Sequence, residues 1–178
     1  MVNPQPATPS GSPADAVAAA RAAAAAVVDP ELRVVTIEEL GILRDVRVES
    51  GTGRVTVTIT PTYSGCPAME VIRRDILAAL AAAGYPDAEV ETVLAPAWST
   101  DWISDAGRAK LAEAGIVPPG PASGPVPLGL PRRRPPAVAC PRCGATDTEE
   151  LSRFGATACK ALWRCTRCAE PFEYLKAI

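Results

Sequence analysis

The alternation of apolar and polar residues predicts a β-hairpin in the first half of the chain. Residues 43–50 (LRDVRVES) and 54–61 (RVTVTITP) alternate on either side of a Ser-Gly-Thr-Gly turn, which is typical of two antiparallel strands. Residues 67–83 instead carry apolar side chains at helical spacing, and Gly84 ends this helix. Residues 87–96 read as a third strand, and the sequence leaves its direction relative to the hairpin open.

Helices are expected before and after these strands along the chain. Ser12 followed by Pro13 is a typical helix start, and an alanine-rich helix runs from there to about residue 28. Residues 104–116 predict a last short helix. The expected fold class is therefore α+β, with a small α/β domain in which the hairpin and third strand pack with helices.

Residues 117–139 are dominated by proline and glycine and keep no apolar period, which is typical of a semi-rigid linker. The alternative is a proline-rich ligand for a recognition domain. The expected organisation is a disordered N-terminus over residues 1–12, a domain over 13–117, a linker over 118–138 and a cysteine-containing ribbon over 139–178.

Composition narrows the classes of function. The formal net charge of −2 and the sequence pI near 5.3 argue against recruitment to nucleic acid or to a membrane surface. Neither a secretory signal nor a bilayer-length apolar run is evident, so we expect a cytoplasmic protein with reduced thiols. Six cysteines in that setting indicate metal or redox chemistry, and the absence of histidine excludes His-based catalysis and His-containing metal sites.

Two Cys-x-x-Cys pairs near the C-terminus predict a closed four-sulfur metal site, with structural zinc favoured over iron. Free thiols or a disulfide would need both spacings to arise by coincidence. Ala169 stands where the second knuckle usually has glycine. Cys159 is a possible additional thiol, either a small buried residue or a labile metal or persulfide ligand beside Lys160. The predicted zinc ligands are Cys140, Cys143, Cys165 and Cys168.

Cys66 lies apart from these cysteines, between Gly65 and Pro67 at the junction of the second strand and the following helix. A helix N-terminus stabilises negative charge, so we expect this position to lower the pKa of the thiol. Thr62 and Ser64 add hydroxyl groups to the same loop.

The Asp-Pro-Glu stretch after the first helix offers two carboxylates, Asp29 and Glu31, in a bend restricted by Pro30. Together with Cys66 and the loop hydroxyls, they would form an open, transient iron site. Spacing alone equally allows a helix stop with a solvated pair of acids.

Four stretches resemble the SufT-like family of small α/β domains linked to iron–sulfur cluster assembly: VVDPEL, LGILRDVRV, VTVTITPTYSGCPAME and VLAPAWSTDWIS. That family centres on a reactive cysteine in a T-x-x-x-C-P loop, matched here from Thr62 to Pro67. With the C-terminal stretches CPRCG and FGATACKALWRCTRCAEPFEYLK, the chain looks like the PaaD-type subgroup of phenylacetate degradation. The resemblance covers about residues 14–117 and 138–178.

The resemblance implies a non-catalytic role beside the phenylacetyl-CoA 1,2-epoxidase, a di-iron monooxygenase. A chain without histidine cannot supply the Glu-x-x-His pairs of such an oxygenase, and no flavin fingerprint appears. The implied task is maturation or delivery of an iron or iron–sulfur centre. The resemblance implies that the transient metal is handled by Cys66, Asp29, Glu31 and Thr62, and that the ribbon holds a structural zinc.

The implied partners are the oxygenase subunits and their iron–sulfur/flavin reductase, together with possible self-association. A purely structural or regulatory oxygenase subunit is the main alternative. A nucleic-acid-binding ribbon is a third, opposed by the acidic residues of the ribbon and by the lack of interleaved stacking aromatics.

Overall fold

The structure, a computed structural model, describes residues 12–120 and 138–176. The chain divides into two compact units, Met1–Trp98 and Ser99–Ile178, and each is described by itself. Residues 1–11 of the expected disordered start and residues 121–137 of the expected linker lie outside the described residues.

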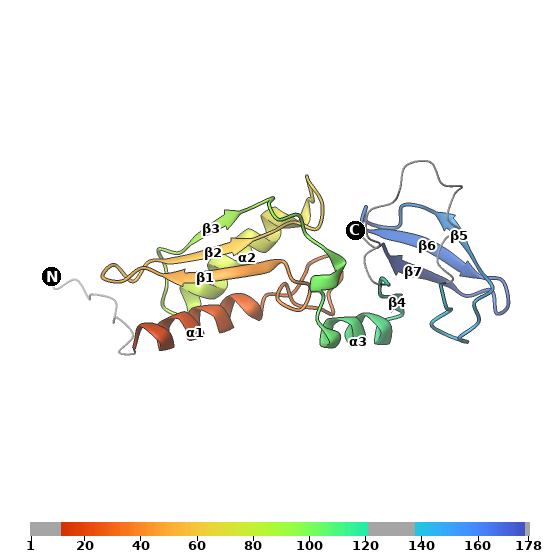
Figure 1. The fold of residues 1–178 in the computed structure, drawn as a ribbon, viewed down its shortest axis with the longest axis horizontal. Coiled ribbons are helices and arrows are strands. Elements are labelled where there is room, and N and C mark those ends of the chain that lie inside the picture. The colour runs from red at the N-terminus through yellow and green to blue at the C-terminus, as the bar shows by residue number, and fades with distance from the viewer. Residues whose placement is uncertain (1–11, 121–137, 177–178) are drawn as a thin grey trace. The chain divides into compact units, whose positions relative to one another are not determined.

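The first unit contains a three-stranded sheet in the order β1-β2-β3 (Figure 1). Strands β1 (Leu43–Val48) and β2 (Val55–Ile59) form the expected antiparallel hairpin. Strand β3 (Glu89–Thr92) pairs with β2 in parallel, which settles the direction that the sequence left open. The chain makes this connection through helix α2 (Ala68–Ala82), as parallel neighbours require a crossover.

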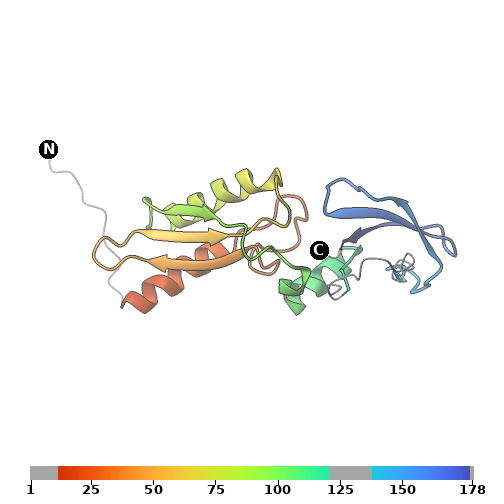
Figure 2. The ribbon, with the colours of Figure 1, turned by 45° about the horizontal axis from the view of Figure 1, so that its top comes forward.

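Two helices pack against this sheet, and together they enclose the apolar core. Helix α1 (Pro13–Ala25) contacts β1 and α2, while α2 contacts β3 (Figures 1 and 2). Ser12 caps α1 as expected, because its hydroxyl accepts from the backbone N–H of Asp15 at 3.3 Å. The main buried side chains of the sheet and of α2 are Val46, Val55, Val57, Ile59, Ile72, Ile76, Leu80 and Val90.

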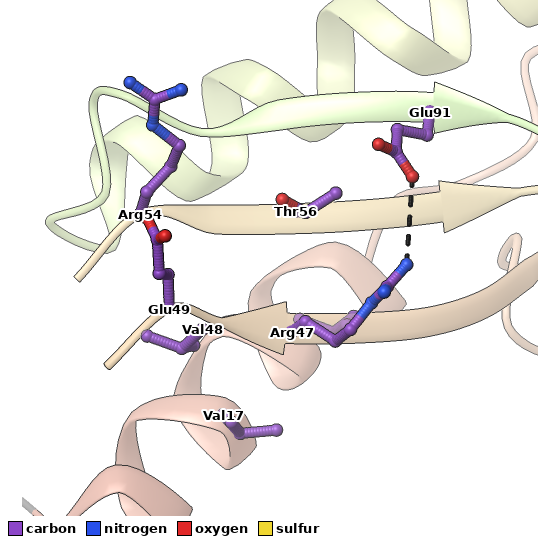
Figure 3. Close-up of a pocket in the computed structure, with 8 residues that line it drawn as sticks. Val17, Arg47, Val48, Glu49, Arg54, Thr56 and Glu91 are labelled. Carbon is purple, nitrogen blue, oxygen red and sulfur yellow. Dashed lines mark ion pairs between the residues drawn. The ribbon is translucent and has the colours of Figure 1, made fainter. Parts of the chain in front are cut away.

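A shallow cleft of about 590 Å³ lies along β1, and polar and charged side chains line much of it (Figure 3). Arg47 reaches across it to Glu91, with 3.8 Å between Nη2 and Oε2, and both side chains are exposed. Exposed ion pairs of this kind contribute little free energy. None of the cysteines lines this cleft, so the candidate chemistry lies elsewhere.

The second unit is built around a four-stranded sheet in the order β4-β7-β6-β5. Strand β4 pairs in parallel with β7 and ties the segment after Trp98 to the ribbon. The sequence placed this segment in the first domain, up to residue 117, and those domain limits stay a prediction. The elements of the unit are the 3-10 helix η1 (Thr100–Trp102), α3 (Asp105–Glu113), β4 (Ile116–Val117), β5 (Thr148–Ser152), β6 (Lys160–Cys165) and β7 (Pro171–Leu175).

Candidate functional site

The four ribbon cysteines converge as the sequence predicted. Their sulfur atoms all lie within 4.8 Å of one another. The sulfurs of Cys140 and Cys168 are 3.7 Å apart, and those of Cys143 and Cys165 are 3.6 Å apart. A tetrahedron with metal–sulfur bonds of about 2.3 Å has edges of about 3.8 Å. The two pairs at 3.6 and 3.7 Å therefore match the edge of such a tetrahedron, and the whole group is close enough to surround a single ion.

The backbone of the second knuckle supports negative charge on sulfur. The N–H of Cys168 donates to Sγ of Cys165 at 3.5 Å, and this bond is the largest of several hydrogen bonds that lower the pKa of Cys165 to about 7. Ala169 follows with a φ of 61°, in the left-handed region that favours glycine. Alanine thus replaces the usual glycine of the knuckle at a position whose backbone conformation favours glycine.

Cys66 lies in a tight turn that leads from β2 into α2. Gly65 has a φ of 83°, a conformation that glycine adopts without steric cost. The backbone N–H of Cys66 donates to the carbonyl of Tyr63 at 3.3 Å, and the carbonyl of Cys66 accepts from Met69 at 3.3 Å. The thiol is half-buried, while Pro67 serves as the N-cap residue of α2. The cysteine therefore sits where the first turn of a helix can act on it.

The expected lowering of the Cys66 pKa is wrong in its net direction. Burial is the largest influence and raises the pKa of the thiol. The backbone N–H of Ala68, in the first turn of α2, lowers it as expected, and so does a hydrogen bond with the Tyr63 side chain. The carboxylates of Glu31 and Asp29 then raise it further. Desolvation thus outweighs the helix N-terminus at this site.

The influence of Glu31 and Asp29 on the pKa of Cys66 shows that the fold brings the Asp-Pro-Glu bend close to the thiol. The loop that follows α1 and the loop that follows β2 lie at one end of the sheet in both views (Figures 1 and 2). This end also receives the carboxyl ends of the parallel strands β2 and β3, where open α/β sheets commonly bind ligands. Thr62 lies in the same loop as Cys66 and is half-buried.

Asp29 holds its own loop together. Its side chain is 6% exposed, and Oδ1 accepts from the backbone N–H groups of Glu31 at 2.9 Å and of Leu32 at 2.8 Å. Its backbone N–H donates to Val35 at 3.0 Å, which closes the loop on the other side. The carboxylate thus has a structural role in the turn. The prediction that Asp29 is a metal ligand did not include this role.

Tyr63 is the residue that the sequence reasoning missed. Its side chain hydrogen-bonds with the Cys66 thiol, whereas only the neighbouring hydroxyls of Thr62 and Ser64 were considered. This contact could have been predicted from the sequence, because a phenol three residues before a cysteine in a tight turn lies within reach of its sulfur.

Cys159 lies outside the four-cysteine group. It is buried just before β6, and its sulfur is 3.0 Å from Oγ1 of Thr157. None of the six cysteines, all of which lie in the described residues, forms a disulfide.

Comparison with known proteins connects both units to characterised families. Residues 17–94 match a family model described as an iron-sulfur cluster assembly protein, and residues 127–176 match the PaaD zinc beta ribbon domain. Over 150 residues, the chain is 46% identical to an Escherichia coli (strain K12) protein that is named as one of the subunits of 1,2-phenylacetyl-CoA epoxidase. The match covers 84% of this chain and 86% of that protein.

The chain belongs to the PaaD family. This confirms the resemblance drawn from the cysteine loop and the ribbon. The chain is also 39% identical over 79 residues to the Bacillus subtilis (strain 168) Fe-S protein maturation auxiliary factor YitW, and this match covers 44% of this chain and 76% of that protein.

A crystal structure of a Bacillus anthracis protein, titled a domain of unknown function DUF59, is similar in fold to this chain. Its TM-score is 0.51 at 30% identity, covering 56% of this chain and 94% of the other. The α+β class expected for the PaaD family chain is thereby confirmed. Among its described helices, none has the length and apolar character needed to cross a membrane.

Proposed function

We propose that this chain is a non-catalytic accessory protein of a phenylacetyl-CoA epoxidase and that it delivers iron or an iron–sulfur cluster to the complex. The names of its relatives, an epoxidase subunit and an Fe-S maturation factor, support this role. The observation that carries it is the placement of Cys66 on a half-buried turn beside the carboxylates of Glu31 and Asp29. Cys66 is the proposed transfer ligand, assisted by these acids and Thr62.

The electrostatics of the loop suit a cation better than a bare thiolate. Glu31 and Asp29 raise the pKa of Cys66 because they disfavour another negative charge nearby. The same negative field attracts a cation, and a metal displaces the proton from a thiol that it binds. Cys66 then stays protonated while empty and releases its proton as the cargo arrives.

The two cysteine sites serve different purposes in this proposal. The four cysteines of the ribbon would surround an ion with sulfur on all sides, and such closed sites are structural. We assign zinc to it. The Cys66 loop offers one thiol and oxygen ligands, so it holds its cargo weakly enough to release it.

The remaining expectations belong to the same proposal. The chain acts in the cytoplasm and binds oxygenase subunits and their reductase, with self-association as a further contact. It binds neither nucleic acid nor membrane.

A structural or regulatory subunit without metal transfer is the second candidate. Two observations favour it: burial keeps the Cys66 thiol protonated, and Oδ1 of Asp29 is engaged by the backbone of its own loop. In this case the oxygenase would need the chain for assembly and not for its metal.

Replacing Cys66 with serine separates the two candidates. The oxygenase subunits are produced with this chain or with Cys66→Ser, and the purified complex is analysed for iron and for epoxidation of phenylacetyl-CoA. Delivery predicts an assembled complex that is short of iron and inactive. Cys159→Ser is the matched control, because it replaces a buried thiol outside the loop and should leave iron unchanged. Full metallation with Cys66→Ser would leave only the structural role.

A further inference from the structure

The ribbon exposes an aromatic side chain on an ordered turn. Phe154 follows β5 and is 66% exposed, far more than a benzyl group of this size usually is in a small domain. Arg153 and Lys176 lie beside it, and we call these three residues the aromatic tip. Leu151, three residues earlier, is also exposed.

Several contacts hold the aromatic tip in place. The backbone N–H of Phe154 donates to Oγ of Ser152 at 3.2 Å, and that hydroxyl donates to the Phe154 carbonyl at 2.8 Å. Nζ of Lys176 donates to the Arg153 carbonyl at 3.0 Å and lies 4.6 Å from the centroid of the Phe154 ring. The exposed ring is therefore positioned without being packed into the core.

An ion pair between a buried lysine and a half-buried glutamate supports the same turn. The N–H of Gly155 donates to the carbonyl of Lys160 at 2.8 Å. Nζ of Lys160 lies 2.7 Å from Oε2 of Glu173, and the lysine side chain is 6% exposed. A Cβ on Gly155 would meet both the Glu173 carboxylate and the Lys160 side chain at 3.4 Å, so the turn packs closely on this pair.

The charge on the aromatic tip is positive. In the part of the chain that the structure describes, no ion pair links Arg153 or Lys176 to a carboxylate. Glu173, the acid that supports the turn, is already paired with Lys160. The tip thus presents an apolar ring flanked by two cations.

We propose that the aromatic tip is the docking point for a partner protein that offers an apolar pocket rimmed by carboxylates, on another subunit of the epoxidase. The identity of the partner rests on the proposed function. Aromatic residues and arginine dominate the binding energy of interfaces, and a side chain that is already positioned costs little entropy to bind. The flanking cations supply the complementary charge that selects an acidic rim.

The test measures binding of the full-length zinc-loaded chain to the immobilised oxygenase assembled from its other purified subunits, by biolayer interferometry. Phe154→Ser should weaken binding by about 10- to 30-fold, as loss of an interface hot spot does. Lys176→Glu should weaken it as well, and rising salt should slow association of the unaltered chain. Leu94→Ser is the matched control, since Leu94 is 63% exposed in the first unit and should leave the affinity unchanged.

Two outcomes overturn the inference: Phe154→Ser binds as tightly as the unaltered chain, or the unaltered chain does not bind the oxygenase. Native mass spectrometry of each variant confirms that the ribbon metal is retained. Iron loading keeps the two proposals distinct. If Phe154→Ser binds normally while Cys66→Ser fails to load iron, docking at the aromatic tip is refuted and delivery stands. If Phe154→Ser weakens binding while Cys66→Ser loads iron fully, docking stands and delivery is refuted.

Discussion

Asp29 provides a sharp test of how the loop beside Cys66 is built. Its carboxylate is almost fully buried, and Oδ1 accepts two backbone hydrogen bonds, from Glu31 and from Leu32. In Asp29→Ala both donors lose their partner, and the N–H of Leu32 belongs to a buried residue. Asp29→Asn keeps an oxygen at the same position and removes the charge.

The expected cost follows from these contacts. A hydrogen bond to a charged acceptor contributes about 1.5–3 kcal/mol, and desolvation of the buried carboxylate offsets part of the sum for two. We therefore expect Asp29→Ala to reduce the free energy of unfolding by about 2–3 kcal/mol. Asp29→Asn should reduce the free energy of unfolding by about 1 kcal/mol or less, because the amide oxygen can still accept both hydrogen bonds, as neutral bonds in place of charged ones.

Urea unfolding followed by circular dichroism at the helical minimum measures this cost, because α1 and α2, two of the three α-helices in the described residues, belong to the first unit. With a slope of about 1–1.5 kcal/mol per molar urea, Asp29→Ala should lower the midpoint by about 2 M. A loss below about 1 kcal/mol would refute the structural role. If Asp29→Asn folds well and still loads iron into the oxygenase, the charge of Asp29 has no part in delivery.

Three other features of the chain give predictions of their own. Native mass spectrometry should show one zinc ion per chain, lost in Cys143→Ala; a folded ribbon without metal would contradict this. Ala169→Gly should stabilise the ribbon by about 0.5–1 kcal/mol in metal-loaded thermal unfolding, because alanine is strained at positive φ; no gain would mean that strain is absent. Iodoacetamide should alkylate Cys66 more slowly than an unperturbed thiol at about pH 8, since its pKa is raised, and Glu31→Gln should speed the reaction by lowering that pKa; an unchanged rate would refute the influence of Glu31.

Local patterns were sufficient where a short stretch contained the whole interaction. The hairpin strands, the capped start of α1 and helix α2 appear close to where alternation, helical spacing and capping placed them. Each Cys-x-x-Cys spacing likewise marks a local turn that brings two thiols together. The meeting of the two turns is a long-range contact, because it brings Cys140 to Cys168 and Cys143 to Cys165.

Long-range contacts escaped the sequence reading. Strand β4 is only two residues long, Ile116–Val117, and its pairing with β7 joins it to residues far along the chain. No periodicity can mark so short a strand. The direction of β3 was open for a related reason, because the sequence predicts helix α2 but not whether that helix crosses over the sheet to a neighbouring strand.

By itself the sequence determined which residues carry chemistry: a cysteine at a strand–helix junction, an acid pair in a proline bend and four cysteines in two knuckles. These follow from residue type and spacing over a few positions. Only the tertiary structure decided that the acid pair lies near Cys66, that Asp29 is occupied by its own loop, and that the pKa of Cys66 is raised. The physical reason is that desolvation and through-space charge depend on which segments fold over a group, and those segments are distant in sequence.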